Sequence, residues 1–196
     1  IAAVLTAIGA AAYRRRVDEV DEVRVRFGTT VLGEMPVLRD PVRRGIDAIF
    51  SHQAPAEVTE ALQSLRTNVE FLLKERRPRS IAVVSASSGE GKSTISAALA
   101  WALASVGEQV TIVDADLRRP TLHKSLHSRL SPGIGSADQL PVDRLVQQTP
   151  LATLRLLSAG VANRHPAEVL RANLPLVLSA LQDETVVIDC PPIEGF

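Results

Sequence analysis

The stretch 86–94, "ASSGEGKST", constrains the fold more than any other part of this chain. It begins where the apolar run "SIAVVSA" (80–86) ends, and it leads into "KSTISAALAWALASVG" (92–107), a pattern that predicts a helix. Gly89 and Gly91 allow the backbone to bend so that successive N–H groups point at one anion, and the helix start adds positive charge. A strand, this loop and a helix in that order predict a phosphate-binding loop. The alternative is a glycine-rich turn with an incidental lysine.

The nucleotide contacts are expected along this loop. Lys92 would reach the outer phosphates, and Ser93 would give its hydroxyl to Mg²⁺. Ala86 stands where the motif G-x-x-x-x-G-K-[ST] begins with glycine, and alanine can replace it if that position needs no positive φ. The predicted contacts with ATP are Ser88, Gly89, Glu90, Gly91, Lys92, Ser93 and Thr94, together with Asp116 from a later segment.

Apolar runs that alternate with helical patterns predict the fold class. Further strands are expected in "VTIVDAD" (110–116), "LATLRLLSAG" (151–160) and "TVVIDC" (185–190), and further helices at 57–74 and 166–182. Aromatic residues make up only 3% of the chain, so Ala, Val, Leu and Ile must build the core. The chain is therefore expected to be an α/β protein with a parallel β-sheet that helices flank on both faces.

Two of the predicted strands end in aspartate. Asp114 and Asp116 follow one strand and Asp189 ends another, so all three would meet the phosphate loop at the carboxyl edge of the sheet. Phosphoryl transfer needs Mg²⁺ held by a hydroxyl and a carboxylate, and a group that takes the proton of the nucleophile. Ser93, Asp114 and Asp189 are the predicted metal ligands, and Lys92, Asp114 and Asp189 the predicted catalytic residues. Asp114 could also be the proton acceptor. A helix cap or turn is the alternative for any such aspartate and stays fully open for Asp116.

Charge and cysteine content exclude some classes of protein. The 22 Lys and Arg residues equal the 22 Asp and Glu residues, so no overall basic field favours a nucleic-acid partner. The single cysteine, Cys190, rules out a disulfide framework and suits a reducing compartment. His123 and His127 are four apart on a predicted helix and could bind zinc, but no third ligand stands beside them, which favours two surface residues.

The first sixteen residues have a composition of their own. The run "IAAVLTAIGAAA" (1–12) is followed by Tyr13 and Arg14–Arg16, which is typical of a membrane helix that leaves the bilayer on its cytoplasmic side. A full span needs about 20 residues, so we expect the end of a transmembrane helix at 1–16. A signal-peptide remnant or a buried helix are the alternatives. Residues 17–56 are expected to form a juxtamembrane connector with a short strand-like run at 29–38, and residues 57–196 an incomplete P-loop domain. The start at Ile1 and the end seven residues after Asp189 suggest a fragment truncated at its C-terminus.

Three segments together carry a family resemblance. "SGEGKST", "VTIVDADLRRP" and "VVIDCPP" resemble, in order, the Walker A, Walker A′ and Walker B motifs of the bacterial tyrosine kinases, which are P-loop NTPases of polysaccharide co-polymerases. "EALQSLRTNVEFL", "LRLLSAGVANRHPAEVL" and "TTVLGEMP" resemble other segments of that family. The resemblance covers about the whole chain and is strongest from Thr59 to Pro192.

The resemblance implies a kinase in the inner or plasma membrane with a cytoplasmic catalytic domain that uses ATP and Mg²⁺. It would phosphorylate the tyrosine-rich tail of itself or of a neighbouring subunit, and so regulate capsular or exopolysaccharide synthesis and export. The acceptor tyrosines would lie beyond Phe196. Members assemble through a helix with E-x-x-R-x-x-R, which implies a homo-oligomer. Here the pattern is Glu60, Gln63 and Arg66, without the middle arginine.

Two other functions compete with the kinase. A nucleotide-switch ATPase of the partition or division-site type usually carries an extra lysine at the start of the loop, where this chain has Ser87. A non-catalytic chain-length regulator would keep the nucleotide fold for assembly alone. Intact Lys92, Ser93, Asp114 and Asp189 argue against such degeneration.

Overall fold

The computed structural model describes residues 25, 28–36, 54–74 and 79–193. The predicted membrane segment at 1–16 lies outside these residues. Among the described residues, no helix has the length and hydrophobicity that crossing a bilayer requires. The helices and strands are, in chain order, α4 (Ala56–Leu73), β1 (Arg79–Val83), α5 (Lys92–Ala104), β2 (Val110–Asp114), α6 (Leu122–Ser125), the 3₁₀ helix η1 (Ile134–Ser136), α7 (Val142–Leu145), β3 (Val146–Gln148), β4 (Leu154–Leu157), α8 (Pro166–Ala180) and β5 (Thr185–Asp189).

One sheet organises the described part of the chain. Its strand order is β1-β5-β2-β4-β3. β1, β5, β2 and β4 run parallel, which confirms the predicted α/β class. The sheet is thus mostly parallel, as predicted, although the edge strand β3, which the sequence did not indicate, pairs with β4 in the antiparallel direction. This edge strand is only three residues long and reads "VQQ", which is too short and too polar to give a strand pattern.

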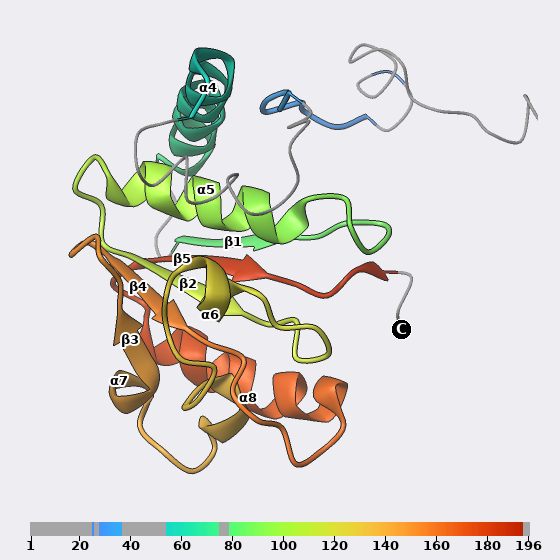
Figure 1. Ribbon diagram of the computed structural model, residues 1–196, viewed down its shortest axis with the longest axis vertical. Helices are drawn as coiled ribbons and strands as arrows, with labels where there is room; N and C mark the ends of the chain where they lie inside the picture. The colour runs from blue at the N-terminus through green and yellow to red at the C-terminus, as the bar shows by residue number, and fades with distance from the viewer. Residues whose placement is uncertain (1–24, 26–27, 37–53, 75–78, 194–196) are drawn as a thin grey trace, which may run out of the picture.

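Helices cover the two faces of the sheet, as the sequence predicted. In Figure 1, α5 lies against one face with α4 beyond it, and α8 with α7 lies on the other side. Ile112 and Val187 belong to the core shared with α5, whereas their neighbours Val113 and Ile188 belong to the core shared with α8. Side chains alternate between faces along a strand, so both faces of β2 and β5 are buried and the two strands are apolar almost throughout.

Residues 28–36 of the predicted connector have no regular secondary structure, so no strand forms in the described part of 29–38. They pack against α4 instead. The side-chain amide of Asn68 donates a hydrogen bond to the Leu32 carbonyl oxygen over 2.7 Å. Met35 contacts the small cluster formed by Val58, Leu62 and Ala98, which joins α4 to α5. The apolar residues of this segment, which suggested a strand, thus bury their side chains against helices.

Candidate nucleotide-binding site

The loop between β1 and α5 has the backbone that the glycines predicted. Gly89 and Gly91 have φ angles of +89° and +84°, and Gly91 caps the N-terminus of α5 in the left-handed conformation. An added Cβ at either glycine would meet no atom within 4 Å. Glycine is therefore favoured at these positions because of the backbone conformation and not because of crowding. Ala86 has no positive φ, which is the condition under which alanine can replace the leading glycine. Residues 88–91 are exposed, so an anion can reach the loop.

This loop lies at the edge of the sheet where the strand-end aspartates lie. Figure 1 shows the loop before α5, the end of β5 and the loop after β2 on the same side of the molecule. Asp114 and Asp189 stand opposite each other in the register of β2 and β5. The carboxyl edge of the parallel sheet therefore brings the three sequence motifs together, as predicted.

Lys92 is the centre of the site. Its ammonium group lies 2.7 Å from Asp189 Oδ1 and 4.0 Å from Asp116 Oδ2. It also lies 3.4 Å from the Ser93 hydroxyl. Only 7% of the Lys92 side chain and none of the Asp189 side chain is exposed, so bulk water screens this ion pair little. The Lys92 ammonium group thus lies within 4.0 Å of three other predicted site residues.

Asp189 has a further partner that the motifs did not indicate. The hydroxyl of Ser96, which is fully buried, lies 3.1 Å from Asp189 Oδ1 and 2.9 Å from the Lys92 carbonyl oxygen. Asp189 Oδ2 is buried and has no hydrogen-bond partner within the described residues. A polar residue four positions after Lys92, on the buried face of a helix, was the one signal in the sequence that could have found Ser96.

Asp114 is fully buried and bonded to the backbone. Its Oδ1 accepts the N–H of Asp116 over 3.3 Å, and its Oδ2 accepts the N–H groups of Thr121 and Leu122, each over 3.2 Å. These amides lie between β2 and the start of α6, so Asp114 shapes this loop as a cap does. Burial, and next the negative charge of Asp189, raise the pKa of the Asp114 carboxyl group to about 7.

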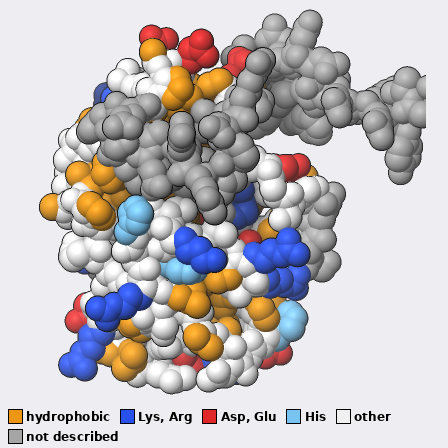
Figure 2. Space-filling view, in the orientation of Figure 1, with side chains coloured by type: hydrophobic (Ala, Val, Ile, Leu, Met, Phe, Trp, Pro, Cys, Tyr) orange, Lys and Arg blue, Asp and Glu red, His pale blue; other side chains and the backbone are white. Residues whose placement is uncertain are grey.

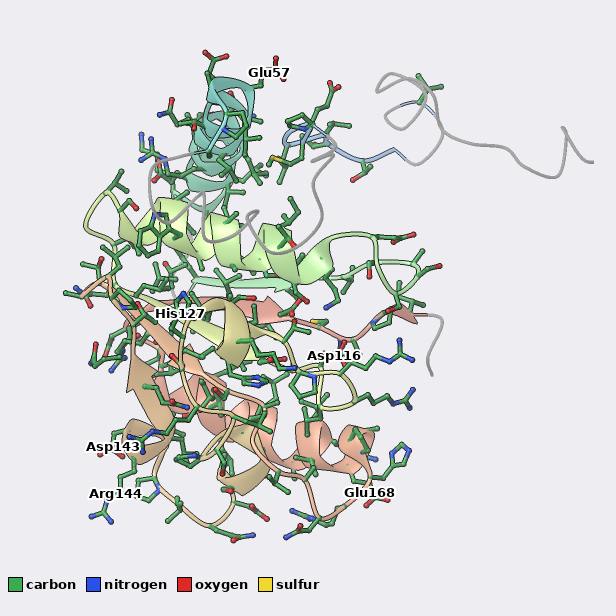
Figure 3. All side chains as sticks on the ribbon, in the orientation of Figure 1. Glu57, Asp116, His127, Asp143, Arg144 and Glu168 are labelled. Carbon is green, nitrogen blue, oxygen red and sulfur yellow. The ribbon has the colours of Figure 1, made fainter. Side chains whose placement is uncertain are left out.

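Asp116 lies closer to the surface. Its Oδ1 accepts the N–H of Arg119 over 3.1 Å, while its Oδ2 faces Lys92. Figure 3 shows it in the loop after β2, beside the end of β5. Asp116 therefore combines the two roles that the sequence left open. Its Oδ1 stabilises a local turn, and its Oδ2 points into the site.

A divalent cation fits this arrangement only with help from other ligands. Within the described residues, no three His, Cys, Asp or Glu side chains form a cluster that could hold a metal ion alone. However, the carboxyl groups of Asp116 and Asp189 both face Lys92, and Asp189 Oδ2 lacks a hydrogen-bond partner among the described residues. Asp114 lies opposite Asp189 in the register of β2 and β5. Mg²⁺ usually takes one or two carboxylates and completes its shell with water and phosphate oxygens, and this donor set suits such a site.

The two histidines do not share a helix. α6 ends at Ser125, and His127 follows it with a φ of +51°. The expectation of a helical pair was therefore wrong, because the helix stops after one turn. Figure 3 shows His127 at the opposite end of the sheet from Asp116.

Positive side chains are dispersed rather than aligned on the visible surface. On the face in Figure 2, the described Lys and Arg side chains lie in separate groups and not in one stripe. The absence of a nucleic-acid partner remains a prediction from the balanced charge.

Comparison with known proteins supplies the family. The model of the ParA family, described as NUBPL iron-transfer P-loop NTPase, matches residues 77–192. Tyrosine-protein kinase CpsD of Streptococcus agalactiae is 30% identical over 161 residues, which cover 76% of this chain and 67% of CpsD. The chain is a ParA-like P-loop NTPase and belongs to the bacterial tyrosine kinase family. Tyrosine-protein kinase YwqD of Bacillus subtilis (strain 168) is 34% identical over 140 residues, or 69% of this chain.

The fold agrees with this family. The solved structure titled BceF Tyrosine Kinase Domain superposes with a TM-score of 0.78 at 29% identity, over 90% of this chain and 77% of that one. This member of the bacterial tyrosine kinase family spans 59% of the length of YwqD, so part of that relative has no counterpart in the chain.

Proposed function

We propose that this chain is the nucleotide-binding part of an ATP-dependent protein-tyrosine autokinase that regulates capsular or exopolysaccharide synthesis and export. The observation that carries the proposal is the position of Lys92, which a glycine-rich loop and a helix start place between Asp189 and Asp116. The names of CpsD and YwqD, both called tyrosine-protein kinases, support the choice of reaction.

Binding of the nucleotide begins with an exchange of partners at Lys92. In the structure its ammonium group neutralises Asp189. The outer phosphates of ATP carry more negative charge than one carboxylate, so they compete for the lysine. The backbone N–H groups of 88–94 and the N-terminal end of α5 bind the remaining phosphate oxygens. These groups act most strongly on the charge that spreads over the phosphoryl group during transfer.

Release of Lys92 leaves carboxylate oxygens ready for the cation. Ser93 and Asp189 would hold Mg²⁺ with support from Asp114, and the ion would supply positive charge that stabilises the phosphates during transfer. Asp189 suits this role because its Oδ2 lacks a partner in the described residues. Asp114 suits a supporting role, because both its oxygens accept backbone N–H groups.

The proton of the tyrosine hydroxyl needs an acceptor at the same edge. The sequence left this role open for Asp114. The geometry favours Asp116, whose Oδ2 faces the site while its Oδ1 is anchored by the N–H of Arg119. Asp116 would take the proton as the tyrosine oxygen bonds to the γ-phosphorus of ATP, while the bond from that phosphorus to the bridging oxygen breaks and ADP leaves.

The cellular setting is part of the same proposal. The apolar run 1–12 and Arg14–Arg16 support a membrane anchor, with the catalytic part on the cytoplasmic side. The partners would be the polysaccharide export machinery and neighbouring copies of the chain, which supply acceptor tyrosines. The helix that would mediate assembly is α4. Its Gln63 is exposed, and its Arg66, the one arginine of the assembly pattern, lies 3.9 Å from Glu70.

The test incubates the protein with labelled ATP, Mg²⁺ and a tyrosine-rich acceptor peptide, and then detects phosphotyrosine. Lys92→Met should lower the incorporation of label at least about 100-fold, because the lost charge acts on the transition state. Lys74→Met is the matched control, since Lys74 is an exposed lysine at the end of α4. Incorporation that survives in Lys92→Met would refute the site. Hydrolysis of ATP without phosphotyrosine would favour the nucleotide-switch ATPase.

A further inference from the structure

Ser96 is the only polar residue among the buried residues of α5, which are otherwise alanines and leucines. Its hydroxyl has one hydrogen and two acceptors in reach, the Lys92 carbonyl oxygen and Asp189 Oδ1. In an α-helix the carbonyl of Lys92 accepts the backbone N–H four residues later, so it does not need the hydroxyl. A buried carboxylate needs donors far more than a bonded carbonyl does. The Ser96 hydroxyl therefore stabilises the fold more by donating to Asp189 Oδ1 than by donating to the Lys92 carbonyl oxygen.

The importance of this hydrogen bond changes when Lys92 moves. With Lys92 in place, Asp189 Oδ1 has two side-chain donors, the ammonium group and the Ser96 hydroxyl. Once Lys92 turns to phosphate, Ser96 alone remains of these two. A carboxylate held at one oxygen keeps a fixed orientation, and its other oxygen, Oδ2, is the one without a partner in the described residues.

We propose that Ser96 is a positioning residue for the cation: it holds Oδ1 of Asp189 so that Oδ2 is presented to Mg²⁺ when Lys92 binds the phosphates. The inference rests on the Mg²⁺·ATP site in the proposed function and adds a residue outside the three motifs. Residues that orient a metal ligand through a hydrogen bond typically change metal affinity by 10- to 100-fold when they are replaced.

A simpler role would be a hydroxyl that only bonds back to its own helix. Ser105, at the C-terminal cap of the same helix, does this: its hydroxyl donates to the Trp101 carbonyl oxygen over 2.8 Å. Ser105 is exposed. Ser105→Ala is therefore the matched control. It removes a hydrogen bond from a hydroxyl to a carbonyl oxygen of the same helix, but at the end of α5 opposite to Lys92.

The experiment measures the affinity of a fluorescent ATP analogue with Mg²⁺ and with EDTA. The dissociation constant in EDTA divided by the dissociation constant with Mg²⁺ reports how much the cation strengthens binding, without any phosphotransfer. Ser96→Ala should reduce this ratio about tenfold and change the affinity in EDTA less than about twofold. Ser96→Thr should restore the ratio, since threonine keeps the hydroxyl and donates from a helix in the same way. Ser105→Ala should match the wild type.

Other outcomes would overturn the inference. An unchanged ratio in Ser96→Ala, with only a lower melting temperature, would mean that the hydroxyl serves the helix alone. A wild type that binds the analogue equally with Mg²⁺ and with EDTA would also refute it. If Ser96→Ala does not fold, Ser96→Cys keeps the size but donates weakly and should show the same loss of ratio.

The two proposals fail in different ways. A Ser96-dependent ratio without phosphotyrosine would refute the kinase and support the positioning role. Phosphotyrosine with an unchanged ratio in Ser96→Ala would refute the positioning role alone.

Discussion

Asp114 and Asp189 stand opposite each other at the ends of β2 and β5, and both carboxyl groups are fully buried. Their surroundings differ. Asp189 has the Lys92 ammonium group at 2.7 Å, whereas the hydrogen bonds that Asp114 accepts within the described residues come from backbone N–H groups. Burial, and next the negative charge of Asp189, raise the pKa of Asp114. The pair therefore couples the phosphate loop to the loop that follows β2.

The raised pKa predicts a pH dependence of stability. The pKa of Asp114 is 3.8 in the unfolded chain and about 7 in the fold, so the folded state holds the proton more tightly. This stabilisation is complete below pH 3.8 and is lost as the pH rises through about 7. In EDTA and without nucleotide, the free energy of unfolding should fall between pH 5 and pH 8 by about 2 kcal/mol more in the wild type than in Asp114→Asn.

Urea denaturation at several pH values checks this. Asp143→Asn is the control, because Asp143 is an exposed residue of α7 and Figure 3 shows it far from Asp116. Its profile should follow the wild type. Parallel profiles for the wild type and Asp114→Asn would contradict the prediction.

Gly133 should not tolerate a side chain. Its φ of −165° is extended, so any residue could adopt the backbone conformation. An added Cβ, however, would lie 2.2 Å from the Ser158 carbonyl oxygen and 2.4 Å from the Gly160 nitrogen. Both are backbone atoms, so the segment after β4 would have to move. Gly133→Ala should lower the free energy of unfolding by about 3 kcal/mol.

Chemical denaturation of Gly107→Ala gives a loss of unfolding free energy with which the loss in Gly133→Ala can be compared. Gly107 has a φ of +92° and open space around its Cβ position, so alanine there meets strain but no clash. Its cost should be only about 1 kcal/mol. Equal losses for the two variants would show that crowding at Gly133 is not the dominant effect.

The segment 28–36 should contribute to stability through its packing against α4 and α5. Met35 is partly buried against Val58, Leu62 and Ala98. Met35→Ala should lower the free energy of unfolding by about 1 kcal/mol, less than at a fully buried site. The neighbouring Glu34 is exposed, and Glu34→Ala should change stability by less than about 0.5 kcal/mol. If thermal melts of the two variants coincide, the packing of 28–36 contributes nothing measurable.

Short patterns allowed the order of the main elements to be predicted, with errors at their ends. The helix expected at 57–74 is α4 (Ala56–Leu73), and the strand expected within 185–190 is β5. The helix expected at 92–107 ends earlier, at Ala104. Periodicity indicates which face is buried, but where a helix ends depends on local caps and contacts, which a pattern does not contain.

The errors arise where a tertiary contact or the end of a short element overrides a local pattern. β3 is a strand because β4 provides its hydrogen-bond partners, and 28–36 is not a strand because α4 and α5 provide a surface for its apolar side chains. His127 leaves the helical pattern because α6 ends after one turn. In each case a contact with a distant segment, or the end of a short element, overrode the local preference.

Local features were enough to predict the phosphate loop, the strand-end aspartates and the α/β class, because glycine placement, charge position and hydrophobic period can be read along the chain. How these groups pair with one another depends on the folded structure. It joined Lys92 to Asp189, directed the oxygens of Asp114 to backbone N–H groups, and added Ser96 to the site. Such choices depend on distances across the sheet and on the cost of burying a polar group without a partner, and both exist only in the folded chain.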